Sequence, residues 1–454
     1  MARRTQASQG AAPRNPPTDG SAAACPSPAA EAQGGARLIA GRALVQTVRH
    51  FFPELSVWLD RLPDTRVQED CTYSRRFLAW WGFLLYLLQL GARRQLDYEL
   101  RDDGPHVLTN LNRLAQTEQT TLPVHDTLDH FLEHVKLSGW ERLRTRLVQR
   151  LVRMKALDSA RLLGQVVLLL DATGLICFHR RHCPHCLVYK HGKQTLYVHQ
   201  VLEAKVLGPA GVVVSLDSEF IENADAAGEK GRSAEEVKQD CELKAMHRLL
   251  PRIKKTYPQL RFVLAVDSLY GCGPVFALTQ QLGWSLVVTF KQGRTPTLWR
   301  EFRALLPHCP ENCLKRDWAD RPAQEFRWVT HLSYEDSEGR TWKLNALDCT
   351  ETATDGPQQY FAWLTALPVN KNTVEEIAQK GGRDRWKVEN EGFNRQKNSG
   401  LNLEHVYSTD PEKWKSYYLL LQIAFILVQL VSVAVCCAGW RRSLVARCGS
   451  CSVA

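Results

Sequence analysis

Two kinds of hydrophobic periodicity divide the chain. Residues 41–158 carry apolar side chains at helical spacing, as in RRFLAWWGFLLYLLQL from Arg75 to Leu90, and predict an all-helical region. After Gly164 the pattern changes to short continuous apolar runs, which are typical of strands buried on both faces. The chain is therefore expected to consist of a helical region followed by an α/β region.

Two of the apolar runs are followed directly by an aspartate. VVLLL stops at Asp171, and FVLAV stops at Asp267. Between them, LYVHQVLEAKVL and VVVSLDSEFI flank a Gly-Pro-Ala-Gly turn and predict a hairpin, and a helix is expected from near Ala234 to Tyr257. A short helix and the strand SLVVTF follow. This order predicts a mixed α/β sheet in which the strand ends carry the chemistry.

The remaining segments differ in composition. Residues 1–40 form a low-complexity run, which we expect to be a disordered tail. Residues 294–370 are strand-like and rich in tryptophan, and predict a β-rich insertion between two parts of one α/β domain, 159–293 and 371–437. Helical periodicity resumes at Thr373, which begins a capping-box pattern. Residues 438–454 are a basic tail that contains cysteines.

One apolar run is long enough to span a membrane. It reads YYLLLQIAFILVQLVSVAVCC, from Tyr417 to Cys437, and Gln422, Gln429 and Ser432 interrupt it at helical spacing. A helix buried in a protein core on nearly all sides gives the same pattern. We favour the core helix and expect no stable membrane association; the alternative is a basic protein anchored by this segment.

Composition narrows the choice of partners and compartment. The length of 454 residues suggests roughly two or three folded units. A formal net charge of +10 favours binding to polyanions such as DNA and RNA. The 14 cysteines lack the dense, regular spacing of a small secreted scaffold, and the N-terminus lacks the apolar core of a secretion signal. We therefore expect a reducing cytoplasm.

The two aspartates after apolar strands are the first candidates for chemistry. If their strands are neighbours in one sheet, the carboxylates of Asp171 and Asp267 emerge together and can share hard cations, of which Mg²⁺ is the natural one. An aspartate after a strand also starts turns, and each of the two taken alone would be interpreted in that way.

A third candidate element favours a metal site over two unrelated turns. The run RWKVENEGFNRQK begins at Arg385, and on an α-helix Arg385 and Glu389 share a face. Glu391 diverges from Glu389 by about 200° at 3.6 residues per turn, so only one of the two glutamates can point at the site. We choose Glu389 and keep Glu391 as the alternative. A salt bridge on a surface helix is the simpler explanation of the same spacing.

From about residue 160 to 430 this order of features resembles the DDE transposases of bacterial insertion sequences. It is similar to the cut-and-paste group, whose ribonuclease-H-like catalytic domain is interrupted by a β insertion before the glutamate. That group carries a tyrosine–arginine–glutamate–lysine signature. Arg385 matches the arginine, Glu389 the glutamate and Lys397, one position late, the lysine, whereas Gly382 stands in place of the tyrosine. The stretches DCELKAMHRLL and LNLEHVYS are also similar to this family.

The resemblance implies an enzyme that cleaves DNA strands at the ends of its insertion sequence and transfers them to target DNA. Asp171, Asp267 and Glu389 would hold Mg²⁺, for which Mn²⁺ can substitute, and paired cations would stabilise the attacking and leaving oxygens. Arg385 and Lys397 would contact phosphates near the cut.

The implied partners are double-stranded DNA, the terminal inverted repeats of the element and target DNA, bound by a homodimer in a bacterial cytoplasm, in association with the nucleoid. Residues 41–158 would bind the DNA ends. Lys291 is a candidate contact to the DNA backbone or a solvated loop lysine. The alternatives are an inactive transposase-derived DNA-binding protein and a nuclease without strand transfer.

A second constellation is rich in cysteine and histidine. Cys183 and Cys186 have the Cys-x-x-Cys spacing that suits zinc, although a second ligand pair is missing in regular form. His191 or His199 could close such a site. Ordinary loop cysteines explain the pattern as well, and we favour that interpretation.

Overall fold

The computed structural model describes residues 41–101, 104–192, 194–223, 239–318, 321–353, 356 and 358–448, and from Ala43 onward they belong to one compact unit. The side chains of His191 and of residues 435–448 lie outside the described part. The predicted tail, residues 1–40, also lies outside it, as do residues 449–454.

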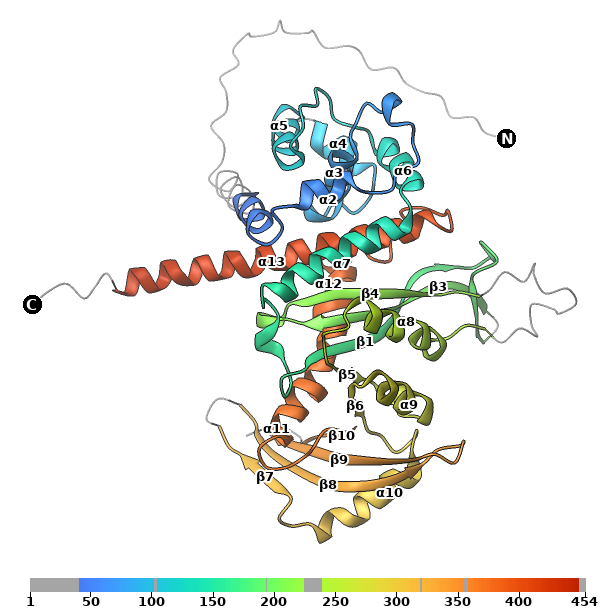
Figure 1. Ribbon diagram of the computed structural model, residues 1–454, viewed down its shortest axis with the longest axis vertical. Coiled ribbons are helices and arrows are strands. Elements are labelled where there is room, and N and C mark those ends of the chain that lie inside the picture. The colour runs from blue at the N-terminus through green and yellow to red at the C-terminus, as the bar shows by residue number, and fades with distance from the viewer. Residues whose placement is uncertain are drawn as a thin grey trace, which may run out of the picture. The chain divides into compact units, whose positions relative to one another are not determined.

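The first part of the chain is helical, as its periodicity predicts (Figure 1). Residues 41–51 are helical, and the helices that follow are α2 (Leu55–Asp60), α3 (Arg75–Leu87), α4 (Gln95–Arg101), α5 (Gly104–Ala115), α6 (His125–His134) and α7 (Leu137–Arg153), with 3-10 turns η1 (Gln68–Asp70) and η2 (Asp158–Ala160). Ser74 caps α3, because its side chain accepts a hydrogen bond from the Phe77 amide. Helix α3 buries most of its apolar side chains, including Trp80 and Trp81.

The α/β part is built on one mixed sheet of ten strands. The strands are β1 (Val166–Phe178), β2 (Leu187–His191), β3 (Gln194–Leu207), β4 (Val213–Ile221), β5 (Phe262–Val266), β6 (Ser285–Thr289), β7 (Cys313–Arg316), β8 (Ala323–Glu335), β9 (Thr341–Thr352) and β10 (Gln359–Thr365). Their order is β2-β3-β1-β5-β6-β10-β9-β8-β7, and β4 pairs with β3. Strands β1, β5 and β6 run parallel, and the other pairings are antiparallel.

The mixed α/β sheet and the β3–β4 hairpin confirm the predictions from sequence. The connecting helices are α8 (Glu242–Thr256), α9 (Gly273–Leu282) and α10 (Pro296–Leu305), with 3-10 turns η3 (Pro209–Gly211), η5 (Ser268–Tyr270) and η6 (Leu306–His308). Helix α8 begins at Glu242 rather than near Ala234, which lies outside the described residues.

One strand boundary was predicted wrongly. Strand β1 does not end at Asp171 but continues to Phe178, because its second half pairs with β3. What ends near Asp171 is the parallel pairing of β1 with β5, whose last partners are Leu169 and Ala265. The apolar run in the sequence therefore marks the part of β1 that has strands on both sides.

The tryptophan-rich segment continues the main sheet. Strand β10 pairs with β6, and β9, β8 and β7 follow in order, so these strands extend the sheet that carries β1 and β5. The segment also contains helix α10, which the β-rich prediction does not include.

The segment that bears Arg385 is helical but irregular. It consists of α11 (Val374–Glu376), the π-helix η7 (Ile377–Gly382), the 3-10 turn η8 (Arg383–Trp386), the π-helix η9 (Val388–Asn394) and α12 (Arg395–Asn398). The Thr373 hydroxyl does not cap it but donates to the Pro368 carbonyl, 2.8 Å away. The sequence predicts the position of this helical segment correctly, but the prediction of regular α-helical geometry is wrong.

The last helix, α13 (Lys413–Cys448), contains the long apolar run. Within the described residues, Lys413–Ala434 is long and apolar enough to cross a membrane, with a mean hydropathy of 2.0. The most apolar stretch of this segment is 72% buried inside the protein. The helix packs there against α3, α7 and β4 (Figure 1). This burial supports the core-helix interpretation.

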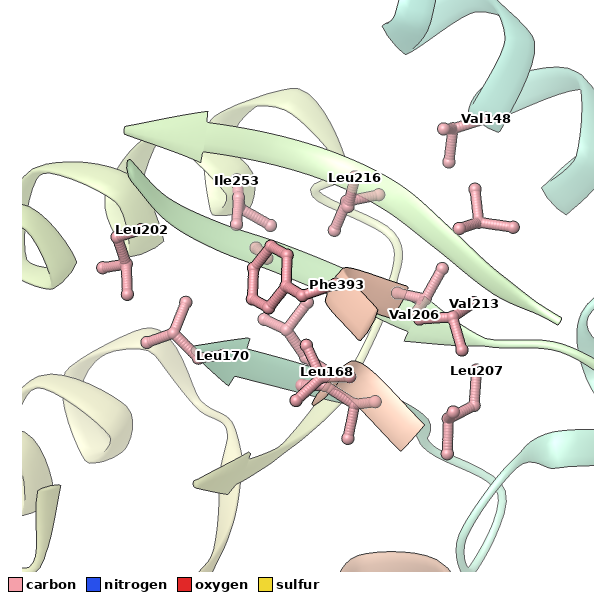
Figure 2. Close-up of a cluster of buried hydrophobic side chains, with 14 of the residues drawn as sticks. Val148, Leu168, Leu170, Leu202, Val206, Leu207, Val213, Leu216, Ile253 and Phe393 are labelled. Carbon is pink, nitrogen blue, oxygen red and sulfur yellow. The ribbon is translucent and has the colours of Figure 1, made fainter. Parts of the chain in front are cut away.

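The core of the α/β part joins side chains from several elements. Figure 2 shows Phe393 of η9 in a buried cluster with Leu168 of β1, Val206 of β3 and Leu216 of β4. Phe393 therefore fixes the irregular helical segment on the sheet through apolar burial.

Candidate active site

The sheet places Asp171 and Asp267 side by side. Each lies two residues beyond the last paired residues of β1 and β5, Leu169 and Ala265, so they occupy matching positions on parallel neighbours. Neighbouring strands lie about 4.8 Å apart, and side chains two residues apart in a strand return to the same face. The two carboxylates consequently share one face and one edge of the parallel pairing.

Local hydrogen bonds hold each aspartate. The Oδ1 atom of Asp267 accepts from the Leu269 amide at 2.9 Å and so opens the turn η5. The Oδ1 atom of Asp171 accepts from the Ala172 amide at 3.0 Å, and across the strand Asp171 is the register partner of Glu203 on β3. Asp267 thus does start a turn, as the simpler interpretation of the sequence requires, and it also lies next to a second carboxylate.

The electrostatic environment of Asp171 is that of a crowded anionic site. Its pKa is raised to about 6, mainly by burial and in part by the negative charges of Asp267 and Glu242, against the lowering effect of Arg385. The Arg385 Nη1 atom lies 3.8 Å from Asp171 Oδ2. The Nε atom of Arg385 is buried without a hydrogen-bond partner among the described residues, so the guanidinium carries an unpaired donor at this site.

Glu242 is a site residue that the sequence did not single out. It lies in the first turn of α8, and its Oε2 atom accepts a hydrogen bond of 3.2 Å from the Tyr270 hydroxyl. Burial raises the pKa of Glu242, and the charge of Asp267 raises it further. An acidic residue in the first turn of a helix is common for reasons of helix electrostatics, so its position alone gave no signal.

The two candidate glutamates both lie on the π-helix η9. Glu389 is exposed, and Glu391 lies 3.5 Å from Arg395, with which it forms an ion pair. Within the described part of the chain, ligand atoms of Asp171, Asp267 and Glu389 do not form a group within 4.8 Å of one another. The structure therefore brings Asp267 and Arg385 next to Asp171, whereas Asp171, Asp267 and Glu389 do not form a close cluster of three carboxylates among the described residues.

The predicted DNA contacts have different surroundings. Lys397 forms an ion pair with Glu404, with 2.7 Å between Nζ and Oε1. Lys291 is exposed in the loop after β6. Next to Arg385 in the chain, the Trp386 side chain is 46% exposed, and its ring meets Phe361 edge-on. Of Arg385, Lys397 and Lys291, Arg385 is the residue that lies next to an aspartate of the site.

Gly382, which stands where the resembling family has tyrosine, is enclosed. A Cβ atom at this position would overlap the Trp363 indole of β10, whose Cζ2 atom would lie only 2.7 Å away. A tyrosine cannot occupy this position without displacing Trp363. Contacts that the family makes through the tyrosine are accordingly not available from residue 382.

Cys183 and Cys186 are both buried, and the histidine beside them is His199. The side chain of His191, the other histidine considered from sequence, lies outside the described residues.

Comparison with protein-family models gives no match for this chain. Comparison with curated proteins gives none either.

Proposed function

We propose that this protein is a metal-dependent DNA transposase of the DDE type. The observation that carries the proposal is the matching position of Asp171 and Asp267 on the parallel neighbours β1 and β5. Two carboxylates far apart in sequence and adjacent in a sheet provide the oxygen ligands that divalent cations bind in phosphodiester chemistry.

The strand order supports a ribonuclease-H-like core. Within the larger sheet, β4-β3-β1-β5-β6 comprises an antiparallel trio followed by two strands parallel to β1. We propose that these five strands are the catalytic core and that β7 to β9, with β10 as their link to β6, belong to the insertion before the Arg385 segment.

The donor set fits Mg²⁺. All candidate ligands are carboxylate oxygens, and Arg385 only partly offsets the effect of burial, which disfavours the charged form of Asp171. Asp171 and Asp267 would hold the ion, and Glu389, exposed on the π-helix η9 that packs against β1, would complete the ligand set on metal binding. When bound, Mg²⁺ or Mn²⁺ stabilises negative charge on the attacking and leaving oxygens of the phosphodiester.

The residues around the ligands bind and orient the DNA. The guanidinium of Arg385, which lies beside Asp171, donates to a phosphate oxygen next to the carboxylates, since a guanidinium suits phosphate recognition. The hydrogen bond from Tyr270 holds Glu242 beside the pair, where it adds negative charge. The net charge of +10 favours association with double-stranded DNA, both element ends and target. We propose that the protein acts as a homodimer on DNA within the nucleoid.

The test is cleavage of DNA that carries the sequences flanking the gene, in the presence of Mg²⁺ or Mn²⁺. Asp171→Asn, Asp267→Asn and Glu389→Gln should each abolish cleavage and strand transfer while DNA binding is retained, because each removes a ligand charge from the site. Glu391→Gln is the matched control and should cut normally.

Each outcome of this experiment decides something. Full cleavage by the Glu389→Gln protein with loss of cleavage in Glu391→Gln assigns the third ligand to Glu391, and loss in Glu242→Gln alone assigns it to Glu242. Cleavage that survives both Asp171→Asn and Asp267→Asn contradicts the proposal. Cleavage without strand transfer identifies a nuclease.

A further inference from the structure

A second cluster of potential ligands lies apart from the carboxylates. Cys183 and Cys186 lie in the turn between β1 and β2, and His199 lies in the middle of β3. All three side chains are buried. The two Sγ atoms are 3.6 Å apart, and the Nε2 atom of His199 lies 3.5 Å from Cys183 Sγ and 3.4 Å from Cys186 Sγ.

These three distances are those of a tetrahedral zinc site. Zinc binds thiolate sulfur at about 2.3 Å and histidine nitrogen at about 2.0–2.1 Å, which at tetrahedral angles separates two sulfurs by about 3.8 Å and a sulfur from a nitrogen by about 3.5 Å. Thiols are weak hydrogen-bond donors, so hydrogen bonding alone gives little reason for three such groups to converge on one point.

The surroundings of His199 orient its ring for ligation. Its Nδ1 atom faces Glu222 Oε1 at 3.8 Å, and Lys415 holds the other carboxylate oxygen of Glu222 at 2.8 Å. The Trp414 ring, with its centroid 5.1 Å from that of His199, packs beside the imidazole. At 3.8 Å this carboxylate is beyond hydrogen-bond distance, but it lies on the Nδ1 side and leaves Nε2 facing the two sulfurs, and a carboxylate on that side is common around a histidine that binds a metal.

A disulfide between Cys183 and Cys186 fits the cluster less well. It would not require His199, and the two cysteines are free at a separation well beyond the bond length of about 2.05 Å. The group of His130, Glu133 and His134 on α6 has ligand atoms at similar spacing, but its side chains are not buried. Burial together with two sulfur ligands distinguishes the Cys183 cluster.

We propose that Cys183, Cys186 and His199 bind one structural Zn²⁺ ion. The two thiols release their protons to solvent on binding and ligate as thiolates, His199 ligates as neutral imidazole, and the fourth ligand is a water molecule or the exposed His182 next to Cys183. The ion ties the turn 179–186, which contains Arg180 and Arg181, to β3. This proposal does not depend on the proposed function.

The first test is the zinc content of the full-length protein, purified without chelator and measured by inductively coupled plasma mass spectrometry. One zinc per chain is expected, and Cys183→Ser, Cys186→Ser and His199→Asn should each reduce it to near zero. Cys177→Ser is the matched control, because Cys177 is exposed on β1 and should leave the zinc content unchanged.

A second measurement covers the case in which a ligand variant does not fold. The wild-type protein loaded with Co²⁺ in place of zinc should show the visible absorption of tetrahedral cobalt and a thiolate-to-cobalt charge-transfer band. The proposal is overturned if the wild-type protein contains no zinc and does not bind added Zn²⁺. It is also overturned if mass spectrometry finds a Cys183–Cys186 disulfide in protein kept under the reducing conditions of a cytoplasm.

Discussion

At the scale of single residues, the raised pKa of Asp171 makes the stability of the folded protein depend on pH. Its pKa in the folded protein is about 6, against 3.8 for an ordinary aspartate, because burial disfavours the charged form. Between these two values the folded state binds more protons than the unfolded state, so the folded protein loses stability as pH rises through this window. The loss is complete above the folded pKa.

We therefore expect Asp171→Asn to stabilise the protein at neutral pH. The asparagine does not titrate, so the gain in the free energy of unfolding should grow between pH 4 and 6 and stay constant above, reaching about 3 kcal/mol. Urea unfolding at a series of pH values, without added divalent cation and without chelator, measures it. A gain that is the same at pH 4 and pH 7 would contradict a raised pKa for Asp171.

The position of a single residue could be predicted where the local sequence sets it, and not where contacts between distant parts of the chain set it. Asp171 and Asp267 follow apolar runs that set their strands, so their neighbourhood could be predicted. Glu242 could not, since it reaches the site through α8 and the Tyr270 hydrogen bond, which are tertiary features. The requirement for glycine at position 382 likewise comes from Trp363 on a distant strand.

At the scale of elements, periodicity located the helices and strands and failed where hydrogen bonding is irregular. The predicted divergence of Glu389 and Glu391 assumes 3.6 residues per turn, whereas η9 is a π-helix, in which this geometry does not hold. Strand β1 was predicted too short because its second half has a strand on one side only and loses the continuous apolar pattern.

Helix α13 gives a prediction that separates a core helix from a membrane span. The Gln422 side chain accepts hydrogen bonds from Lys205 Nζ at 3.1 Å and from Gln396 at 2.8 Å, all within the buried interior. Gln422→Leu makes the segment more apolar but leaves these donors unpaired, and should lower the free energy of unfolding by about 1–3 kcal/mol. Thermal and urea unfolding measure the change.

The matched control is Ser432→Ala, because within the described residues the Ser432 hydroxyl bonds only to the Val428 carbonyl of its own helix. It should change stability little. A Gln422→Leu protein that is more stable, or that sediments with membranes and stays there in high salt, would favour the membrane-anchored alternative.

At the scale of the whole molecule, the net charge of +10 gives a test of the proposed DNA binding. With a net charge of +10, the affinity for double-stranded DNA should fall steeply as salt increases, because each neutralised phosphate releases bound cations. If Arg385 contacts a phosphate, Arg385→Gln should weaken binding at all sequences and reduce the slope of log affinity against log salt by about one. Fluorescence anisotropy without divalent cations measures both.

Lys315→Gln removes the same unit of charge on β7, the strand at the far end of the sheet order from β1, where Lys315 pairs with Glu325. Its salt slope should match that of the wild type. Equal slopes for all three proteins would show that Arg385 does not contact DNA.

The continuation of β1 beyond Asp171 determines which nearby residues can be substituted without moving this carboxylate. Asp171 lies inside a strand with its backbone fixed by neighbours, and the turn with Arg180 and Arg181 begins only where that strand ends. Arg180 and Arg181, which lie beyond the end of the strand, can therefore be exchanged for other residues without shifting the carboxylate. Evolution could therefore vary these two arginines while the proposed metal ligands stay in place.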